Sequence, residues 1–253
     1  MLAEERRIQL AEWSKLEGRI DAIDAASRLD VAVETVRRDL DILQRRGVVR
    51  RVHGGAISTE RYNSEATVPE RKSSNSAAKL RIAEIAANYI PAQGCIFVDG
   101  GSTTECLWRF LLNKPELLVV TNNIALASLI GESSTKLILL GGEVRPTSLS
   151  TTGNLAVEEL NKFHAQVAFL GVNGISEQAG LTTADMGEAV VKRAMIANAA
   201  ERILLADNSK FGSSFAAKFA TTSEIDRLVT DLDTPEDFLI AFRDADSDVV
   251  VAH

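Results

Sequence analysis

The sequence predicts an α/β protein made of two parts: a small helical domain closed by a strand hairpin, and a larger domain built on a mostly parallel sheet. Two patterns lead to this prediction. Residues 1–57 contain three short helical segments followed by two short strands, and residues 77–253 alternate helical segments with short apolar runs. Residues 58–76 between them are polar and rich in serine, which favours a linker.

Composition supports folded domains and excludes several classes of protein. Of the 253 residues, 45% are hydrophobic and 25% are charged, which excludes a largely disordered chain. No apolar run approaches the ~18 residues of a membrane span, and charges fill the start of the chain where a signal peptide is apolar. Cys95 and Cys106 are interpreted as packing residues of a cytoplasmic protein, and the three histidines lack metal-site spacing. We therefore expect no membrane partner, no metal and no cofactor.

In the N-terminal domain, the pattern predicts helices over residues 3–16, 20–29 and 33–46, and a hairpin over 48–57 around a Gly-Gly turn. The third helix is the most informative. At about 100° per residue, its apolar side chains form one stripe toward a core: Val33, Val36, Leu40 and Leu43. The arginines lie on the far side or flank that stripe. A helix that aims arginines outward, after a short helix and a tight turn, is typical of a winged helix-turn-helix domain.

The distribution of charge favours DNA binding by this domain. The net charge is −7, but residues 33–53 hold six arginines against three acidic residues, whereas residues 59–253 hold 17 Lys/Arg against 25 Asp/Glu. Arginine can contact guanine, threonine can contact a thymine methyl group or a phosphate, and the hairpin could contact the DNA backbone. The candidate DNA-binding residues are Glu34, Thr35, Arg37, Arg38, Arg45, Arg50, Arg51 and His53. The alternative is a helical cap whose arginines form a solvated face.

The C-terminal domain is expected to have helices on both faces of its sheet. The predicted strands are 95–99, 117–121, 136–140, 167–172, 202–206, 227–230 and 248–252, and the predicted helices are 77–90, 104–112, 124–131, 154–163, 187–200 and 235–244. Polar turns, several of them rich in glycine, follow five of the strands. Because the carboxyl ends of parallel strands share one edge, we expect these turns to form a ligand site there.

The turn Asp99–Thr104 could hold a phosphate, because its glycines allow close approach and its amides and hydroxyls lie at a helix start. It matches neither the P-loop nor the dinucleotide fingerprint. The candidate effector-binding residues are Asp99, Gly101, Ser102, Thr103, Thr104, Thr121, Asn122, Asn123, Gly141, Gly142, Arg145, Gly171, Asn173, Glu188, Lys192 and Lys210. The alternatives are simple turns and caps, with Glu188 and Lys192 as an ordinary surface ion pair.

Several motifs resemble the DeoR family of bacterial regulators of sugar metabolism. Thr35–Leu40 (TVRRDL) and Gly47–Ala56 (GVVRRVHGGA) are similar to its winged helix-turn-helix signature. The matches to its sensor domain are Asp99-x-Gly101-Ser102-Thr103, Val120-Thr121-Asn122, Gly141-Gly142, Gly171-x-Asn173-Gly174, Gly180-Leu181-Thr182 and Asp207-x-Ser209-Lys210-Phe211. Arg71, Asn75 and Lys79 match the segment that this family places at the domain junction. One departure is Ala32, where the family usually has a Ser or Thr cap.

The resemblance covers about residues 3–252 and implies a sensor domain similar in fold to ribose-5-phosphate isomerase. It also implies a phosphorylated sugar or polyol as effector, double-stranded operator DNA as partner, and a homodimer or homotetramer. We expect a repressor of carbohydrate uptake or catabolism genes that the effector releases from DNA, and not an enzyme.

Two alternatives are an isomerase-like enzyme, with acid/base chemistry from Asp99, Asp185 or Glu188, and an architectural DNA-binding protein without a ligand. The predicted DNA-binding domain argues against the first, and the polar strand ends argue against the second.

Overall fold

The computed structural model describes residues 2–46, 48–52, 54–58 and 66–253, in two compact units, Met1–Glu65 and Ala66–His253. The division lies within the linker predicted over residues 58–76, but the second unit starts at Ala66 rather than at Ala77. Helix α4 (Val68–Ser73) occupies this stretch, and the backbone N–H of Thr67 donates to Glu70 Oε2 at its start. Pro69 is compatible with the helix because a proline in the first turn needs no hydrogen-bond donor.

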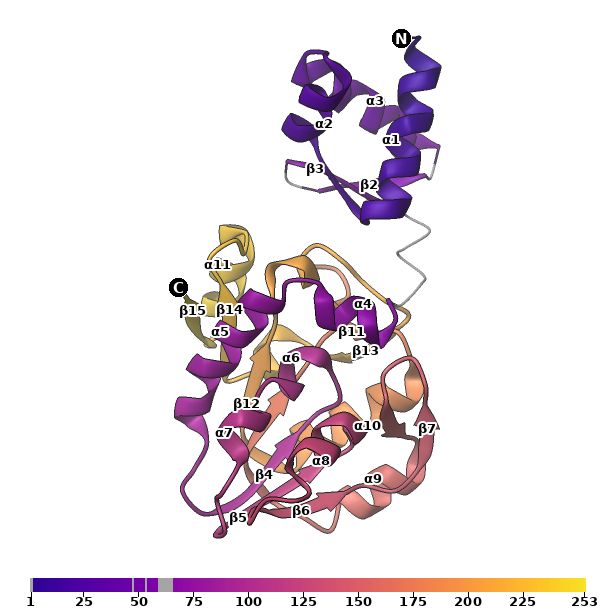
Figure 1. The fold of residues 1–253 in the computed structure, drawn as a ribbon. Coiled ribbons are helices and arrows are strands. Elements are labelled where there is room, and N and C mark those ends of the chain that lie inside the picture. The colour runs from indigo at the N-terminus through magenta and orange to yellow at the C-terminus, as the bar shows by residue number, and fades with distance from the viewer. Residues whose placement is uncertain (1, 47, 53, 59–65) are drawn as a thin grey trace. The chain divides into compact units, whose positions relative to one another are not determined.

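In its described residues, the first unit has three helices and a small antiparallel sheet (Figure 1). Its elements are α1 (Ala3–Glu17), β1 (Arg19–Asp21), α2 (Ala22–Leu29), α3 (Val33–Arg45), β2 (Val49–Val52) and β3 (Gly55–Ser58). The strand order is β1-β3-β2. Val36, Leu40 and Leu43 of α3 are buried and Val33 packs beside them, so the predicted core stripe is confirmed. The arrangement is the winged helix-turn-helix that the sequence predicted.

Strand β1 was not predicted, because its residues fit the start of the helix expected over residues 20–29. It pairs with β3, with Ile20 opposite Ala56. A Cβ atom on Gly55 would lie 1.8 Å from the Ile20 carbonyl oxygen, so this pairing requires glycine. Helix α2 begins after Asp21, whose carboxylate accepts from the backbone N–H of Ile23 at 2.8 Å. At the start of α3, Ala32 makes no side-chain cap, as its residue type implies.

The second unit is built on seven parallel strands in the order β15-β14-β12-β9-β4-β5-β6. Their bounds are β4 (Gly94–Val98), β5 (Leu117–Thr121), β6 (Lys136–Leu139), β9 (Ala165–Leu170), β12 (Ala199–Leu205), β14 (Arg227–Asp231) and β15 (Asp248–Ala252). All seven predicted strands are present and parallel. Their carboxyl ends therefore share one edge, as the predicted site requires.

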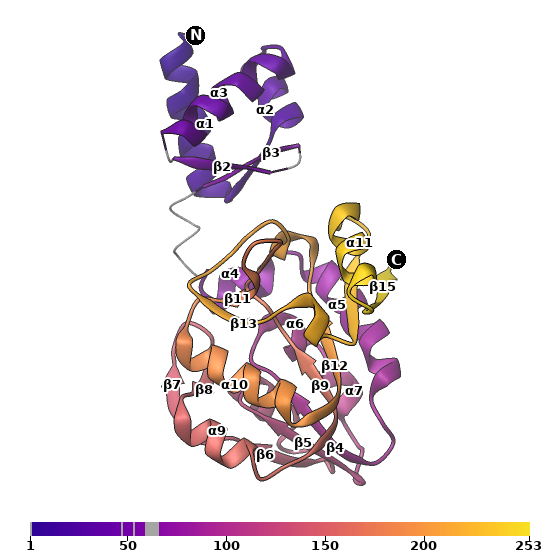
Figure 2. The same cartoon turned by 180° about the vertical axis from the view of Figure 1, so that it is seen from behind.

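Helices cover both faces of this sheet (Figures 1 and 2). They are α5 (Ser76–Ala86), α6 (Ser102–Glu105), α7 (Trp108–Leu111), α8 (Ile124–Ile130), α9 (Asn154–Leu160), α10 (Met186–Ala197) and α11 (Glu236–Asp244). Ile96 and Val98 face a core with α5, α7 and α8, whereas Phe97 faces a core with α9, α10 and α11. Within the described residues, no helix is long and apolar enough to span a bilayer.

Short elements near the sheet edge account for most differences from the predicted pattern. The helix expected over residues 104–112 is divided into α6 and α7. Five further strands are antiparallel: β7 (Glu143–Arg145), β8 (Ser150–Thr152), β10 (Gly174–Ser176), β11 (Gly180–Thr183) and β13 (Ala217–Ala220). They contain three or four residues each, so no periodic apolar pattern marks them in the sequence.

Candidate functional site

The exposed face of α3 carries most of the predicted DNA-binding residues of the first unit. Glu34, Arg37, Arg38 and Arg45 are exposed and Thr35 is half-buried. Arg37 Nη1 lies 3.5 Å from the Glu34 carboxylate one turn earlier. Arginine side chains on an exposed helix face can extend to the edges of bases or to phosphates. The Arg50 side chain and His53 lie outside the described residues.

A buried carboxylate holds this helix against α1. Asp39 is only 2% exposed, although its neighbour Arg38 points to solvent. Its two carboxylate oxygens accept from Arg6 Nε at 2.5 Å and from Arg7 Nε at 3.0 Å. Glu4 extends the contact, because its carboxylate accepts from Arg7 and from Arg46. Hydrogen bonding to Arg46 lowers the pKa of Glu4. These contacts join α1 to α3 and to Arg46, the residue that follows it.

In the second unit, a buried cluster lies at the carboxyl edge of the sheet. We call it the edge cluster: Asp99, Arg145, Gly171, Asn173, Thr183, Glu188 and Lys192. Asp99 follows β4 and is 1% exposed, and its Oδ2 accepts from Lys192 Nζ and from the Gly171 backbone N–H at 2.9 Å. Lys192 is 2% exposed and also donates to the Gly171 carbonyl oxygen at 2.9 Å. Burial raises the pKa of Asp99, and the Lys192 charge opposes that shift.

Glu188 and Lys192 do not form the surface ion pair that their spacing allowed. Lys192 turns to Asp99, whereas Glu188 accepts from Arg145 Nη1 at 3.2 Å and from Thr183 Oγ1 at 2.6 Å. Burial would raise the pKa of Glu188, but the Lys192 charge and hydrogen bonds from Ser148 and Thr183 outweigh it and lower that pKa. Thr183 Oγ1 also lies 3.1 Å from Asn173 Oδ1. The tertiary fold therefore makes both charges buried members of one cluster.

Several predicted residues hold the turns of this edge together. The Gly100 N–H donates to Asn122 Oδ1 at 2.8 Å, and Thr104 Oγ1 donates to the Asp99 carbonyl oxygen at 2.7 Å. Asn123 Oδ1 caps α8, and Thr121 Oγ1 donates to the Val98 carbonyl oxygen. Gly101 and Thr103 form the start of α6 beside Ser102. These contacts assign shaping roles to Thr104, Thr121, Asn122 and Asn123.

The predicted Gly141-Gly142 turn lies beside α9. The Gly141 N–H donates to Glu159 Oε2 at 2.7 Å. A Cβ atom on Gly142, whose φ is +135°, would lie 2.5 Å from the Thr152 carbonyl oxygen. Gly142 therefore allows β7 to return closely against β8. That hairpin carries Arg145 to the edge cluster.

A second group at the same edge combines Lys210, which the sequence predicted as an effector-binding residue, with Asp207, which is not among the predicted residues. Asp207 follows β12 and is 1% exposed, and its Oδ1 accepts from Asn75 Nδ2 at 2.7 Å. Burial would raise the pKa of Asp207, but the charge of Lys210 and hydrogen bonds from Ser209 and Asn75 outweigh it and lower that pKa. Lys210 itself is half-buried in the turn after Asp207. The Asp207-x-Ser209-Lys210 spacing was the signal for Asp207 in the sequence.

Lys79 is 2% exposed, and its ammonium group donates to the carbonyl oxygens of Arg71 and Ser74. Burial lowers its pKa from 10.5 to about 8. The native state therefore releases this proton before the unfolded chain does, and the free energy of unfolding should rise between about pH 8 and pH 10.5. Urea unfolding across this range should show a rise that is missing in Lys79→Met. Equal pH profiles for the two proteins would contradict this assignment.

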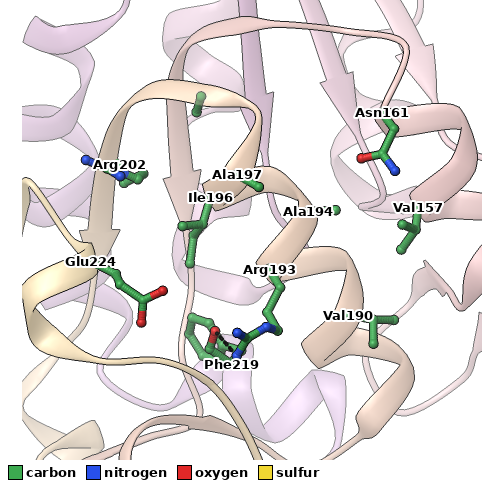
Figure 3. Close-up of a pocket in the computed structure, with 11 residues that line it drawn as sticks. Val157, Asn161, Val190, Arg193, Ala194, Ile196, Ala197, Arg202, Phe219 and Glu224 are labelled. Carbon is green, nitrogen blue, oxygen red and sulfur yellow. Dashed lines mark hydrogen bonds between the residues drawn. The ribbon is translucent and has the colours of Figure 1, made fainter.

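A cavity of about 550 Å³ lies elsewhere on the second unit, beside the C-terminal half of α10 (Figure 3). Its lining includes Val157, Arg193, Ala194, Arg202, Phe219 and Glu224. Arg193 Nη1 donates to the Phe219 carbonyl oxygen at 3.3 Å. The lining of this cavity includes none of the predicted site residues whose side chains the structure describes. Among the described residues, no group of three or more His, Cys, Asp and Glu side chains could hold a metal ion.

Comparison with known families identifies both units. Residues 6–62 match the DeoR-like helix-turn-helix domain, and residues 74–232 match the DeoR C terminal sensor domain. The chain belongs to the DeoR family. This DeoR-family protein is therefore a DNA-binding transcriptional regulator with a sensor domain, and not an enzyme. The isomerase-like alternative is not supported.

Curated relatives cover nearly the whole chain. The glycerol-3-phosphate regulon repressor of Escherichia coli (strain K12) is 31% identical over 91% of this chain and 92% of its own length. The HTH-type transcriptional repressor GlcR of Bacillus subtilis (strain 168) is 33% identical over 91% of this chain and 89% of its own. Among solved structures, ribose 5-phosphate isomerase A from Methanocaldococcus jannaschii has a TM-score of 0.41, with 20% identity over 55% of each chain.

Proposed function

We propose that this DeoR-family protein is a repressor of carbohydrate uptake or catabolism genes, which binds operator DNA and leaves it when a phosphorylated sugar or polyol binds the sensor domain. The observation that carries the proposal is the edge cluster, where buried charges and glycine-rich turns meet at the edge at which parallel sheets bind ligands. The names of the relatives support a regulated set of sugar or glycerol-phosphate genes.

The proposed DNA contacts come from the exposed face of α3 and from the wing, the hairpin β2–β3. Arg38 and Arg45 are the proposed base or phosphate contacts, with Arg37, Glu34 and Thr35 beside them. Arg50 and His53 stay in the proposal from their positions in the sequence. Arg51 has a different environment, because its guanidinium group donates to Asp41 and to the Arg37 carbonyl oxygen of α3.

The proposed effector site combines an anion-binding part with a hydroxyl-binding part. Backbone amides at Gly101–Thr103 and the ammonium group of Lys210 suit a phosphate group. The carboxylates of Asp99 and Glu188 and the amide of Asn173 suit sugar hydroxyls. We further propose a cytoplasmic homodimer or homotetramer, as the resemblance implies.

Fluorescence anisotropy with DNA from upstream of the protein's own gene tests this function. The full chain is titrated at two salt concentrations, alone and with glycerol 3-phosphate, hexose phosphates or inorganic phosphate. We expect tight binding that weakens with salt and is released by one organic phosphate but not by inorganic phosphate. Binding no tighter than to random DNA, with every compound inert, would contradict the proposal for this operator and these effectors.

Arg38→Ala is expected to lower operator affinity by about 1–3 kcal/mol, because a base-contacting arginine makes bidentate hydrogen bonds. Affinity for random DNA should change much less. The control is Arg243→Ala in the second unit, which removes the same charge from an exposed pair with Glu236. Equal operator affinities for Arg38→Ala and this control would exclude base recognition by Arg38.

A further inference from the structure

The Arg51 side chain packs back onto α3, whereas Arg37, Arg38 and Arg45 of α3 are exposed. Its Nη1 donates to the Arg37 carbonyl oxygen at 2.9 Å and to Asp41 Oδ1 at 3.1 Å. The backbone N–H of Arg51 donates to Gln44 Oε1 at 2.8 Å. One residue of β2 thus makes three hydrogen bonds to a single stretch of α3. Its side chain is 27% exposed, compared with 60% for Asp41.

The strand order shows which part of the wing these contacts hold in place. In the order β1-β3-β2, the strand β2 lies at the edge of the sheet and has β3 as its strand neighbour. Val49 anchors the start of β2 in the core, with 1% exposure. The Arg51 contacts anchor the part of β2 that leads toward the wing turn. They join the wing to the recognition helix α3.

Asp41 is otherwise unfavourable at its position. It is an exposed carboxylate on the helix that carries Arg38 and Arg45, and it would repel the phosphates of bound DNA. An exposed ion pair adds about 0–1 kcal/mol to stability, so fold stability is a weak reason for the contact. Holding a second DNA-contacting element in register is a stronger one.

We propose that Arg51 is a positioning residue that fixes the wing to the recognition helix through Asp41 and the Arg37 carbonyl, and that it does not contact DNA. The inference rests on the proposed DNA contact by α3 and the wing. Arg51 stays on α3 in the complex, and the residues toward the wing turn reach the DNA in an orientation set by this contact.

A double-mutant cycle with Arg51→Gln and Asp41→Asn tests the proposal by anisotropy. The probes are a duplex that the full-length protein enriches from a random library, and an unselected duplex. In each single variant, the ratio of the affinity for the enriched duplex to the affinity for the unselected duplex should fall about threefold to tenfold. In the double variant, this ratio should fall no further than in Arg51→Gln alone. Asp41→Asn is the more discriminating variant. Removing a negative charge would by itself raise the affinity for both duplexes, whereas loss of the Arg51 contact should lower the ratio of the two affinities.

Arg51→Lys separates positioning from a phosphate contact. Lysine keeps the charge but cannot reproduce the guanidinium fork, so Arg51→Lys should lose the affinity ratio as Arg51→Gln does. The salt dependence of binding should stay at the wild-type slope in both variants. A phosphate contact predicts instead that Arg51→Lys resembles wild type, that Arg51→Gln reduces the slope by about one, and that Asp41→Asn tightens binding. That pattern would overturn the proposal.

Hydrogen exchange without DNA keeps this inference separate from the proposed function. Amides of β2 should exchange faster in Arg51→Gln and in Asp41→Asn, to a similar extent, and at the wild-type rate in Arg243→Gln. Unchanged exchange in β2 would overturn the proposal whatever the DNA results are. If exchange responds as expected but the wild type does not prefer its enriched duplex, the positioning contact stands and the proposed sequence-specific function fails.

Discussion

Asp39→Ala is expected to destabilise the first unit by about 2–3 kcal/mol. The carboxylate is 2% exposed and accepts from both Arg6 and Arg7, so the substitution removes two charge-assisted hydrogen bonds between α1 and α3. The cost should stay below the ~3–5 kcal/mol of a fully buried pair, because Arg6 and Arg7 are 12% and 18% exposed and can turn toward water.

The two tryptophans, one in each unit, allow a clean measurement. Trp13 lies in α1, where Arg28 stacks 3.7 Å from its ring, and Trp108 lies in α7 of the second unit. In a Trp108→Phe background, Trp13 fluorescence reports urea unfolding of the first unit alone. The control is Asp24→Ala, which removes a carboxylate that is 65% exposed and should cost no more than about 0.5 kcal/mol. Equal midpoints for Asp39→Ala and Asp24→Ala would contradict the role given to Asp39.

Lys192→Met is expected to destabilise the second unit by about 3–5 kcal/mol, because it leaves the Asp99 carboxylate buried without its counter-charge. Adding Asp99→Asn should recover part of this loss, since no uncompensated charge then remains. Both single variants and the double variant should lose the response to effector. Operator binding by the first unit should persist, which distinguishes a sensor defect from a DNA-binding defect.

The loss of stability caused by Lys192→Met should also depend on pH in a defined direction. Burial raises the pKa of Asp99, and the variant lacks the ammonium group that opposes this shift. A carboxyl group with a raised native pKa destabilises the fold as pH rises above its unfolded value near 4. The difference in the free energy of unfolding between Lys192→Met and wild type should therefore become smaller when the pH falls from about 7 to about 5. Unfolding of the second unit, followed by Trp108 fluorescence in a Trp13→Phe background, measures this difference. A difference that does not depend on pH would argue that Asp99 is not the uncompensated group.

The sequence was sufficient to predict the elements where apolar residues recur periodically and where polar or glycine residues mark the ends of an element. The apolar runs of the seven central strands predicted a parallel sheet, and the polar residues after them predicted the edge on which the candidate site lies. The stripe of Val36, Leu40 and Leu43 predicted which side of α3 is exposed. The motifs around Arg38 and Asp99 were specific enough to indicate the family that the comparisons confirm.

Local pattern failed where contacts distant in sequence decide the conformation. Ile20 is in a strand only because β3 lies beside it, and Gly55, 35 residues later, permits that approach. Helix α4 forms within a polar stretch that resembles a linker. It belongs to the second unit, in which its Arg71 donates to the Thr147 carbonyl oxygen. Short strands such as β7 and β8 carry no periodicity, so only their pairing defines them.

By itself, the sequence determined the two-domain organisation, the family, the exposed face of α3 and the sheet edge that carries the candidate site. Only the tertiary structure decided which charges are partners. Lys192 bonds to Asp99 rather than to Glu188 four residues before it, and Arg51 bonds to Asp41. For the buried Lys192, the physical reason is that burial makes a charge depend on whichever counter-charge the fold brings within hydrogen-bond distance. For the more exposed Arg51, the reason is that the fold places β2 beside α3. Spacing along the chain can nominate such residues, but it cannot pair them across a sheet edge.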